Sequence, residues 1–589
     1  MFNQHLPRTI ATILLLMLLA FLLAACVKVI GPAPEIGTAR IHDIQGCSHQ
    51  SPYLGRQVEG VTGIVTKKSG NGFYMQDDQP DGQVCSSEGI FVFTITYPDV
   101  RPGDKITVSG EVDEFLPGGI EDRNLTLTQI TDAEFQIVSS GNKLPDAIMI
   151  GENGYLVPDQ HIENDGFREF QPAEDGIDFF ESLESMMVTV TPGMVIGPRN
   201  QFNEVVIIPD KSRGSNLFSS EGALVQRDDD SNPERIILNL NNENRHKVNL
   251  GSRLTKSVTG IVDYAYGNYK INVFGLAEFS DVNPVIEQLD NNSQSLTIAS
   301  YNVENLSIYD DRSKFSKVAA QIANDMDNPD IVILHEVMDD SGTEDDGVVT
   351  SQATLARLVE QIELMSGVHY SIIDNPPINN RDGGINGGNI RTCILFREDT
   401  GIRIADLPQN SILMENPTRI GPDDWPFSVT RKPLVVLFEF NGENFLVTGV
   451  HLTSRGADSP LFGSIQPPAK PEEEKRNQQA QYINRYLSEF HRRLPGVPII
   501  VAGDLNDDPW SNTLSILSRD LLINMNELVP ENERYSYILD GNAIQLDYIL
   551  ISDDLNWKST FQILHLNTSL DHTEQVSDHD AVISEIYFP

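Results

Sequence analysis

The segment LDYILI, Leu546–Ile551, is followed near the C-terminus by the segment SDHDAV, Ser577–Val582. Each segment has the apolar run of a buried β-strand, with polar residues at one end. Asp547 opens the first strand and His579 precedes the second, so the fold can place carboxylates around one imidazole. Such a group can activate a water molecule beside a metal-bound phosphate. The pair predicts a sheet whose strand ends carry the functional residues.

Upstream segments repeat this arrangement. A strand over Ser295–Ser300 leads into the sequence YNVEN, and a strand over Asp330–Leu334 leads into the sequence HEV. Between them, apolar residues from Phe315 to Met326 recur at helical spacing. Strands that alternate with helices predict an α/β sandwich. Further strands are predicted over residues 391–396, 434–440, 444–450 and 498–502, and a helix over residues 473–490.

Polar residues recur in a fixed order at these predicted strand ends. They are Asn302, Glu304, Glu336, the GVHL segment Gly449–Leu452, the GDLN segment Gly503–Asn506, Asp547 and the SDH segment Ser577–His579. This order resembles that of the endonuclease/exonuclease/phosphatase superfamily, and the likeness covers residues 291–589. It implies a four-layer α/β sandwich of the deoxyribonuclease type. It also implies a metal-dependent phosphodiesterase, namely a nuclease and most simply an endonuclease.

The predicted metal ligands are Asn302, Glu336 and Asp578. Phosphodiester hydrolysis requires charge stabilisation at the phosphoryl group and an activated water. Glu336 offers a hard carboxylate for Mg²⁺, which prefers oxygen ligands and retains several waters. Asn302 adds a neutral oxygen, and Asp578 completes or supports the site. The implied cofactor is Mg²⁺, with Ca²⁺ or Mn²⁺ as alternatives.

Five further residues form the predicted catalytic set. Asp504 and Asn506 follow an apolar strand and can orient the water and hold a phosphate oxygen. His579 is expected to contact the phosphate or to move the proton, with Asp547 fixing its tautomer. His451 resembles the second histidine of pancreatic-type deoxyribonucleases, which is assigned as the general acid to the leaving group.

Two positions depart from the family pattern. The residue before Glu336 is His335 instead of the usual Gln, and strand alternation points His335 away from Glu336. The carboxylate that usually partners the second histidine is replaced by the sequence NIR at residues 389–391, so the acid role of His451 stays open. Phosphate-side contacts are predicted for Asn389, Arg391, Arg431 and Arg455.

The N-terminal half of the chain is predicted to contain short strands separated by Gly, Pro and Asp. Those over residues 58–65, 72–76, 89–96 and 105–112 indicate a small barrel or sandwich within residues 37–140. This unit resembles the oligonucleotide/oligosaccharide-binding (OB) module that precedes bacterial secreted nucleases. Its strand aromatics, such as Tyr74, either contact nucleic acid or belong to the core.

Residues 150–285 form a second β-rich block, which resembles the spacer of the same nucleases. The Asn-, Asp- and Ser-rich residues 283–295 are typical of a linker. The catalytic unit then occupies residues 291–589. The predicted fold class is therefore multidomain, with an OB-like barrel, a β-rich block and an α/β sandwich.

Residues 1–26 have the pattern of an export signal, in which Arg8 precedes the apolar run Ile10–Ala25. At about 1.5 Å per residue this run is too short to span a hydrocarbon core of roughly 30 Å. A cleaved signal is therefore expected. Small residues leading into Cys26 resemble a bacterial lipoprotein box, although an ordinary signal peptide or short anchor stays open. Lipidation at Cys26 implies attachment to a membrane of the bacterial cell envelope or the cell surface, with an extracellular location as the alternative.

Three cysteines follow Cys26, and an odd number in an oxidising compartment permits one pair and leaves one thiol. Cys47 and Cys85 lie in one N-terminal segment and can close a loop. Cys393 lies in a strand-like run and is predicted to be a small buried hydrophobe.

The chain has a net charge of −43, which opposes non-specific attraction to polyphosphates. A nuclease that acts on DNA, or on RNA, is the leading hypothesis despite this charge. A phosphomonoesterase or phospholipase of the same superfamily and a non-catalytic surface protein that binds nucleic acid are the alternatives. No obligate protein partner is inferred.

Overall fold

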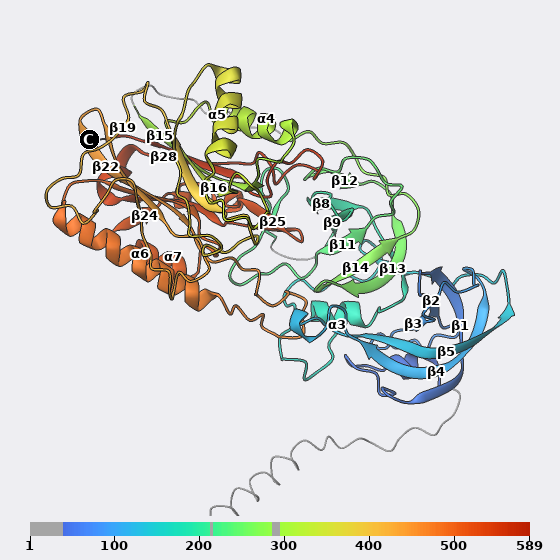
Figure 1. Ribbon diagram of the computed structural model, residues 1–589. Coiled ribbons are helices and arrows are strands. Elements are labelled where there is room, and N and C mark those ends of the chain that lie inside the picture. Colours follow the sequence, from blue (N-terminus) through green and yellow to red (C-terminus); the bar gives the residue numbers. More distant parts are fainter. Residues whose placement is uncertain (1–38, 213–215, 285–294, 589) are drawn as a thin grey trace, which may run out of the picture.

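The computed structural model describes residues 39–212, 216–284 and 295–588. The predicted signal segment with Cys26, and most of the predicted linker, lie outside these residues. None of the helices formed by the described residues is long and apolar enough to cross a membrane. The chain forms a barrel, a broad sheet and a two-sheet sandwich in sequence order (Figure 1).

The N-terminal unit comprises α2 (Ile41–Gln45), β1 (Gln57–Lys68), β2 (Gly72–Gln76), β3 (Gly89–Phe93), β4 (Lys105–Phe115) and β5 (Leu127–Ser139). Its strands form a closed barrel in the order β1-β2-β3-β5-β4. Alternate residues of β4, such as Ile106 and Val108, point inward and fill the barrel together with Ile41 and Ile44 of α2. Four of these strands lie where they were predicted, although β1 and β4 are longer than expected and β3 ends at Phe93. The strand β5 was not predicted.

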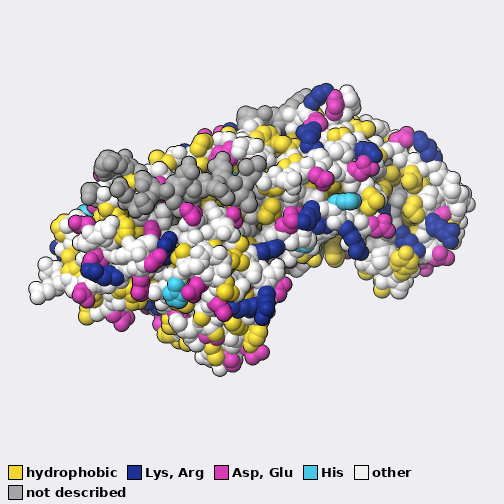
Figure 2. All heavy atoms as spheres, turned by 90° about the horizontal axis from the view of Figure 1, so that it is seen from above, with side chains coloured by type: hydrophobic (Ala, Val, Ile, Leu, Met, Phe, Trp, Pro, Cys, Tyr) yellow, Lys and Arg dark blue, Asp and Glu magenta, His cyan; other side chains and the backbone are white. Residues whose placement is uncertain are grey.

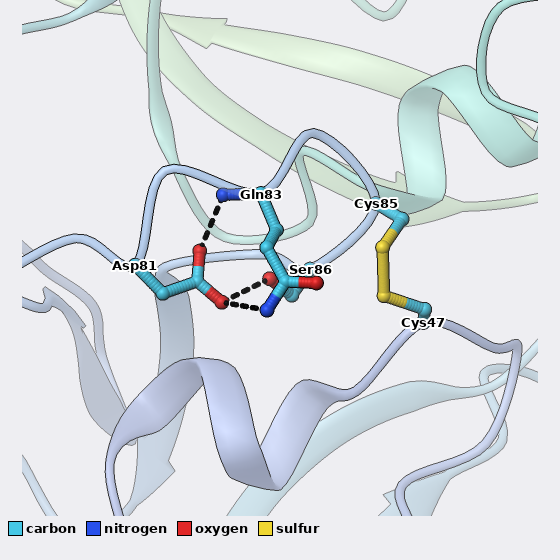
Figure 3. The surroundings of a disulfide bond; sticks show 5 residues. All are labelled: Cys47, Asp81, Gln83, Cys85 and Ser86. Atoms are coloured by element: carbon cyan, nitrogen blue, oxygen red, sulfur yellow. Dashed lines mark hydrogen bonds between the residues drawn. A yellow bond between two sulfur atoms is a disulfide. The ribbon is translucent and has the colours of Figure 1, made fainter.

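A disulfide between Cys47 and Cys85 joins the segment after α2 to the loop between β2 and β3 (Figure 3). Cys393 is free and buried, as predicted. The hydroxyl of Tyr74 donates a hydrogen bond of 3.0 Å to Asp263 of the second unit. The barrel therefore uses this aromatic side chain to dock onto the second unit, and the side chain does not face solvent.

The second unit is an eight-stranded sheet in the order β12-β8-β9-β11-β14-β13-β7-β6. Its apolar face forms a core with helix α3 (Gly176–Glu181), in which Phe180 stacks on Tyr269. The strands are β6 (Ile148–Ile150), β7 (Met187–Val190), β8 (Gly193–Gly197), β9 (Glu204–Pro209), β11 (Ile236–Asn239), β12 (Arg253–Leu254), β13 (Val258–Ala265) and β14 (Asn268–Val273).

The C-terminal unit contains two sheets. The first has the order β17-β18-β16-β15-β29-β28, with β15 (Leu296–Leu306), β16 (Ile331–Val337), β17 (Ser371–Ile373), β18 (Arg391–Phe396), β28 (Thr560–Leu564) and β29 (Ala581–Ile586). The second has the order β19-β21-β22-β23-β27-β24, with β20 also paired to β21. Its strands are β19 (Arg403–Ile404), β20 (Thr418–Arg419), β21 (Leu434–Phe440), β22 (Glu443–His451), β23 (Ile499–Asp504), β24 (Leu522–Asn524) and β27 (Asp547–Ser552).

Four layers result because both faces of both sheets are apolar. Ile298 of β15 packs against the second sheet, whereas its neighbour Ala299 packs against helices α4 (Arg312–Ala320) and α5 (Gln352–Ser366). Helices α6 (Glu473–Arg493) and α7 (Asn512–Ser518) cover the outer face of the second sheet (Figure 1). The sandwich predicted from the strand and helix pattern is confirmed.

The second unit is joined directly to the sandwich. Its strand β10 (Leu224–Val225) pairs in parallel with β26 (Asn542–Ile544), which pairs with β25 (Tyr537–Leu539). The buried Arg199 guanidinium donates two hydrogen bonds, of 2.8 and 3.0 Å, to Asp571. Although burial opposes it, this pairing helps to lower the pKa of Asp571 to about 2. A shared sheet and a buried ion pair thus fix the position of the second unit.

Candidate active site

Three polar residues lie side by side at one end of the second sheet. His451 ends β22, Asp504 ends β23 and Asp547 begins β27, and the strand register pairs Asp504 with both others. Residues paired across neighbouring strands project from the same face. Gly503 permits the close approach of β22 and β23, because a Cβ at this position would lie 1.7 Å from the carbonyl oxygen of Val450.

The first sheet supplies Asn302 and Glu336. Regular strand alternation would point Glu336 toward the covering helices, on the same side as Leu334. However, Glu336 has a φ of 62°, and the pairing of β16 with β18 shifts register between Leu334 and Val337. This irregular strand end directs the carboxylate to Asn302, whose Nδ2 lies 3.2 Å from Glu336 Oε1. Irregular backbone of this kind re-aims side chains at many functional sites.

Asn302 connects the two sheets, because its Nδ2 also donates to Asp504 Oδ2 at 3.3 Å. The backbone N–H of Asn305 donates to Glu336 Oε2 at 3.2 Å. Burial raises the pKa of Asp504 to about 7, with the charges of Asp547 and Glu336 adding to the rise and His579 opposing it. The crowding of buried carboxylates creates a demand for positive charge at this place.

This arrangement fits a small divalent cation. Glu336 provides a hard oxygen ligand of the kind that Mg²⁺, Mn²⁺ or Ca²⁺ prefer, and the carboxylate of Asp504 lies beside it at the same amide group. Asn302 directs its amide N–H group at the same two carboxylates, and a rotation of the amide would present Oδ1 to an ion instead. Asp578 is partly exposed, and the described residues place it near Glu304, with no contact to Glu336. Its predicted role, to complete or support the metal site, stays a prediction.

His579 is held by Asp547, as predicted. Its Nδ1 lies 2.8 Å from Asp547 Oδ2, and its Nε2 lies 3.9 Å from Asp504 Oδ2. Burial alone would lower the pKa of His579, but the charges of Asp547 and Asp504 and the hydrogen bond to Asp547 raise it well above the usual value. The site therefore favours the protonated ring of His579, whose Nε2 is directed to Asp504.

His451 has the opposite character. Burial, together with the charges of Arg431, His335 and His579, lowers the pKa of His451 well below its usual value. Its Nδ1 is buried without a hydrogen-bond partner, and its Nε2 lies 3.4 Å from Asp504 Oδ2. A neutral imidazole without a carboxylate on Nδ1 is poorly suited to act as a general acid.

His335 packs edge-on against His451 with ring centroids 5.8 Å apart. Both of its ring nitrogens are within 3.0 Å of hydroxyl groups, those of Ser300 and Thr392. Burial lowers the pKa of His335 to about 3. His335 is thus an inter-sheet residue whose two ring nitrogens are both engaged by hydroxyl groups.

The four predicted phosphate-side residues divide into two groups. Asn389 and Arg391 are buried and bound to loop groups such as Asp339 and Asp374, so they are not phosphate contacts in this structure. The predicted phosphate contacts of Asn389 and Arg391 are therefore corrected: both side chains form hydrogen bonds with the loops that follow the strands. Arg431 is buried near Glu336 and Asp504, and Arg455 is paired with Asp508 at 2.7 Å.

Asn506 supports Asp504 directly. Its backbone N–H donates a 2.8 Å hydrogen bond to Asp504 Oδ1, while its side chain donates to the carbonyl oxygen of Leu452. A φ of 52° at Asn506 allows this tight turn after β23. Asn506 therefore orients the carboxylate through its main chain.

Sequence patterns missed two residues that position the histidine. Ser536 Oγ donates to Asp547 Oδ2 at 2.7 Å, and the ring of Tyr537 packs against His579 with centroids 4.9 Å apart. Tyr537 begins β25 and Ser536 directly precedes it, and neither belongs to a recognisable motif. Their role depends on a contact between segments far apart in the sequence.

A cavity of about 1000 Å³ opens beside this site, between the sandwich and the second unit. The sandwich contributes Glu304, Lys314 and Asp578 to its wall. The second unit contributes Phe202 and Tyr266, whose side chains are 71% and 86% exposed. Sequence analysis treated this unit as a spacer, whereas the structure makes it one wall of the cleft.

Solved structures with similarity to this chain give low TM-scores. A D. rerio TDP2 humanised by 14 mutations has 17% identity, covers 50% of this chain and 99% of its own, and has a TM-score of 0.33. The human nocturnin catalytic domain with bound sulfate has 18% identity, covers 52% of this chain and 98% of its own, and has a TM-score of 0.35. An endonuclease/exonuclease/phosphatase family protein from Bacteroides thetaiotaomicron has 17% identity, covers 50% of this chain and 98% of its own, and has a TM-score of 0.32.

A comparison with curated proteins gives no match. Residues 140–281 match a domain of unknown function, DUF8508. Residues 299–579 match the model of the endonuclease/exonuclease/phosphatase family, and this range includes most of the sandwich and every candidate catalytic residue described above. The C-terminal unit of this chain is a domain of the endonuclease/exonuclease/phosphatase superfamily.

Proposed function

We propose that this protein is a metal-dependent nuclease that hydrolyses phosphodiester bonds within DNA. One observation carries the proposal. Strand ends of both sheets bring together Glu336, Asp504 and the Asp547–His579 pair, with a bridging amide from Asn302. This arrangement would place a cation beside a proton-transfer group and a positive charge, which phosphodiester hydrolysis requires.

The roles follow from charge and position. Glu336 and Asn302 would hold the cation, which when bound offsets negative charge on the phosphoryl group. Asp504, whose pKa is raised to about 7 by burial and its acidic neighbours, would orient the attacking water and accept its proton. The Nε2–H of His579 would donate to a phosphate oxygen, because Asp547 keeps the imidazole protonated.

His451 is assigned a hydrogen-bonding role toward the leaving oxygen. Its lowered pKa, caused first by burial, leaves it neutral at neutral pH. A neutral imidazole can still donate one hydrogen bond from Nε2 while Nδ1 carries no proton. Buried Arg431, near Glu336 and Asp504, adds positive charge to the same region.

The cleft supports a nucleic-acid substrate. Aromatic side chains stack on bases with little regard to sequence, and Phe202 and Tyr266 are exposed on its wall. On the face drawn in Figure 2, Lys and Arg side chains lie singly or in small groups among Asp and Glu. We therefore assign strand binding to this cleft and not to a broad basic surface.

The five-stranded closed barrel has the architecture of an OB module, and we propose that it belongs to that class. Tyr74 is engaged with the second unit, so an accessory role in localisation fits the barrel better than strand binding through this residue. We further propose that the mature protein is anchored in the bacterial cell envelope or at the cell surface by a lipid on Cys26.

Replacing Glu336 by Gln should reduce cleavage of plasmid DNA by about a thousandfold or more, because a neutral amide binds Mg²⁺ poorly and metal stabilisation contributes several kcal/mol. The exposed residue Glu360 on α5 offers a matched control, and Glu360→Gln should remain active. Cleavage of plasmid, linear DNA and RNA should be measured with Mg²⁺, Mn²⁺, Ca²⁺ or chelator. Full activity of Glu336→Gln, or cleavage in excess chelator, would contradict the metal assignment. Turnover of p-nitrophenyl phosphate or sphingomyelin without DNA cleavage would favour the alternative esterases.

Replacing Phe202 or Tyr266 by Ala should raise the KM for oligonucleotides by roughly 5- to 100-fold with little change in kcat, since each stacked base contributes about 1–3 kcal/mol. Tyr155→Ala is the control, because Tyr155 is 47% exposed on the same unit but does not line the cleft. A small diester such as bis-p-nitrophenyl phosphate should be hydrolysed equally by all variants. An unchanged KM for oligonucleotides in both cleft variants would remove the cleft from the substrate path.

Replacing Cys26 by Ala should release the protein from membranes or block its maturation, because an acyl chain contributes about 0.8 kcal/mol per buried CH₂. Membrane fractionation and mass spectrometry of the mature N-terminus provide the measurement. Unchanged fractionation and an N-terminus without lipid would favour a plain signal peptide.

A further inference from the structure

A second group of converging donor atoms lies far from the catalytic strand ends in the sequence. His49 follows the disulfide-bonded Cys47, Glu163 lies in the loop before α3, and Asp178 lies within α3. One donor atom from each of these three residues lies within 4.8 Å of the other two. The group thus joins the barrel segment to the second unit.

The buried donor atoms of this group have no hydrogen-bond partner outside the group. They are Nδ1 and Nε2 of His49, Oε2 of Glu163 and Oδ1 of Asp178. The Asp178 side chain is fully buried, and its Oδ1 forms an ion pair with His49 Nε2 at 2.8 Å, whereas His49 Nδ1 and Glu163 Oε2 have no partner. Buried polar atoms are rarely left unsatisfied, because the loss of hydration is costly. A third group located between these atoms would satisfy them together.

The remaining atoms of the same side chains are already fixed. Asp178 Oδ2 accepts the backbone N–H of Gln171, and Glu163 Oε1 accepts the backbone N–H groups of Asp165 and Gly166 at 2.7 and 2.9 Å. The ring of His49 is held edge-on by Phe167 and Phe170, with centroids 4.9 and 5.1 Å away. Each side chain is therefore oriented by one set of contacts while its other donor atom stays available.

A neighbouring group of the same composition provides a contrast. His42, Asp81 and Glu88 also converge within 4.8 Å. Here His42 Nδ1 pairs with Glu88 Oε2 at 3.0 Å, and the Asp81 carboxylate accepts hydrogen bonds from Gln83 and Ser86 (Figure 3). The side chains of this group already have hydrogen-bond partners, so the group does not require an additional ion.

We propose that His49, Glu163 and Asp178 bind a structural divalent cation that fastens the N-terminal barrel to the second unit. One imidazole nitrogen with two carboxylate oxygens is a ligand set suited to Zn²⁺, whereas Mg²⁺ and Ca²⁺ favour oxygen ligands alone. Asp175 Oδ2, also buried without a partner, is the nearby candidate for a fourth ligand. This site is separate from the catalytic cation and does not depend on the proposed nuclease activity.

The test uses the full mature chain carrying Glu336→Gln, so that the catalytic site contributes little bound metal. After removal of metal and dialysis against Zn²⁺, the parent should retain one tightly bound equivalent by mass spectrometry. His49→Gln and Asp178→Asn should each lose it, whereas the control His42→Gln should keep it. Zn²⁺ should also raise the Tm of the parent and of His42→Gln, but not that of His49→Gln.

Circular dichroism of the metal-free variants shows whether each one is folded. A folded His49→Gln variant that still retains the full equivalent of zinc would overturn the proposal. A parent that binds no zinc would also overturn it, and would leave His49 and Asp178 as a simple ion pair.

Discussion

Asp504 lies between His451 and Asp547 in the sheet and shares the amide of Asn302 with Glu336 across the sandwich. Acidic groups gathered in this way are unfavourable when buried unless positive charge accompanies them. The structure supplies one such charge through His579. A divalent cation at Glu336 would supply the other, and the remaining features of the site keep these groups at their distances.

The second unit contributes to this geometry. Strand β10 pairs with β26, which pairs with β25, and Tyr537 and its neighbour Ser536 contact His579 and Asp547. Removal of the second unit would leave the hairpin of β25 and β26 without its third strand. The same unit provides the aromatic wall of the cleft. It therefore braces the His579–Asp547 pair and forms one wall of the cleft to which we assign strand binding.

Much of the catalytic unit could be predicted from the sequence because the information is local. Apolar runs placed the strands, and polar residues at the strand ends identified Asn302, Asp504 and His579 as neighbours. The helix predicted over residues 473–490 is present and extends to Arg493. It could be predicted because its apolar residues are regularly spaced. The loop after each strand kept these residues at one edge of the sandwich.

Other features could not be predicted, because they depend on contacts between distant segments. The direction of Glu336 results from a positive φ that alternation does not anticipate. Asn389 and Arg391 resembled phosphate contacts by their place at a strand start, yet loop groups bind them. The cleft wall formed by Phe202 and Tyr266 has no local signal, because it exists only after the second unit docks.

The protonation state of His579 tests the central claim most directly. Nitrogen-15 NMR of imidazole-labelled protein without metal, assigned by the loss of one signal in His579→Gln, would follow both ring nitrogens with pH. Because the carboxylates favour the charged ring, His579 should stay protonated through neutral pH and titrate well above the usual range. Asp547→Asn should shift its titration to lower pH. A His579 that is neutral at pH 7 (near the ordinary histidine pKa of about 6.5), with no response to Asp547→Asn, would contradict the account.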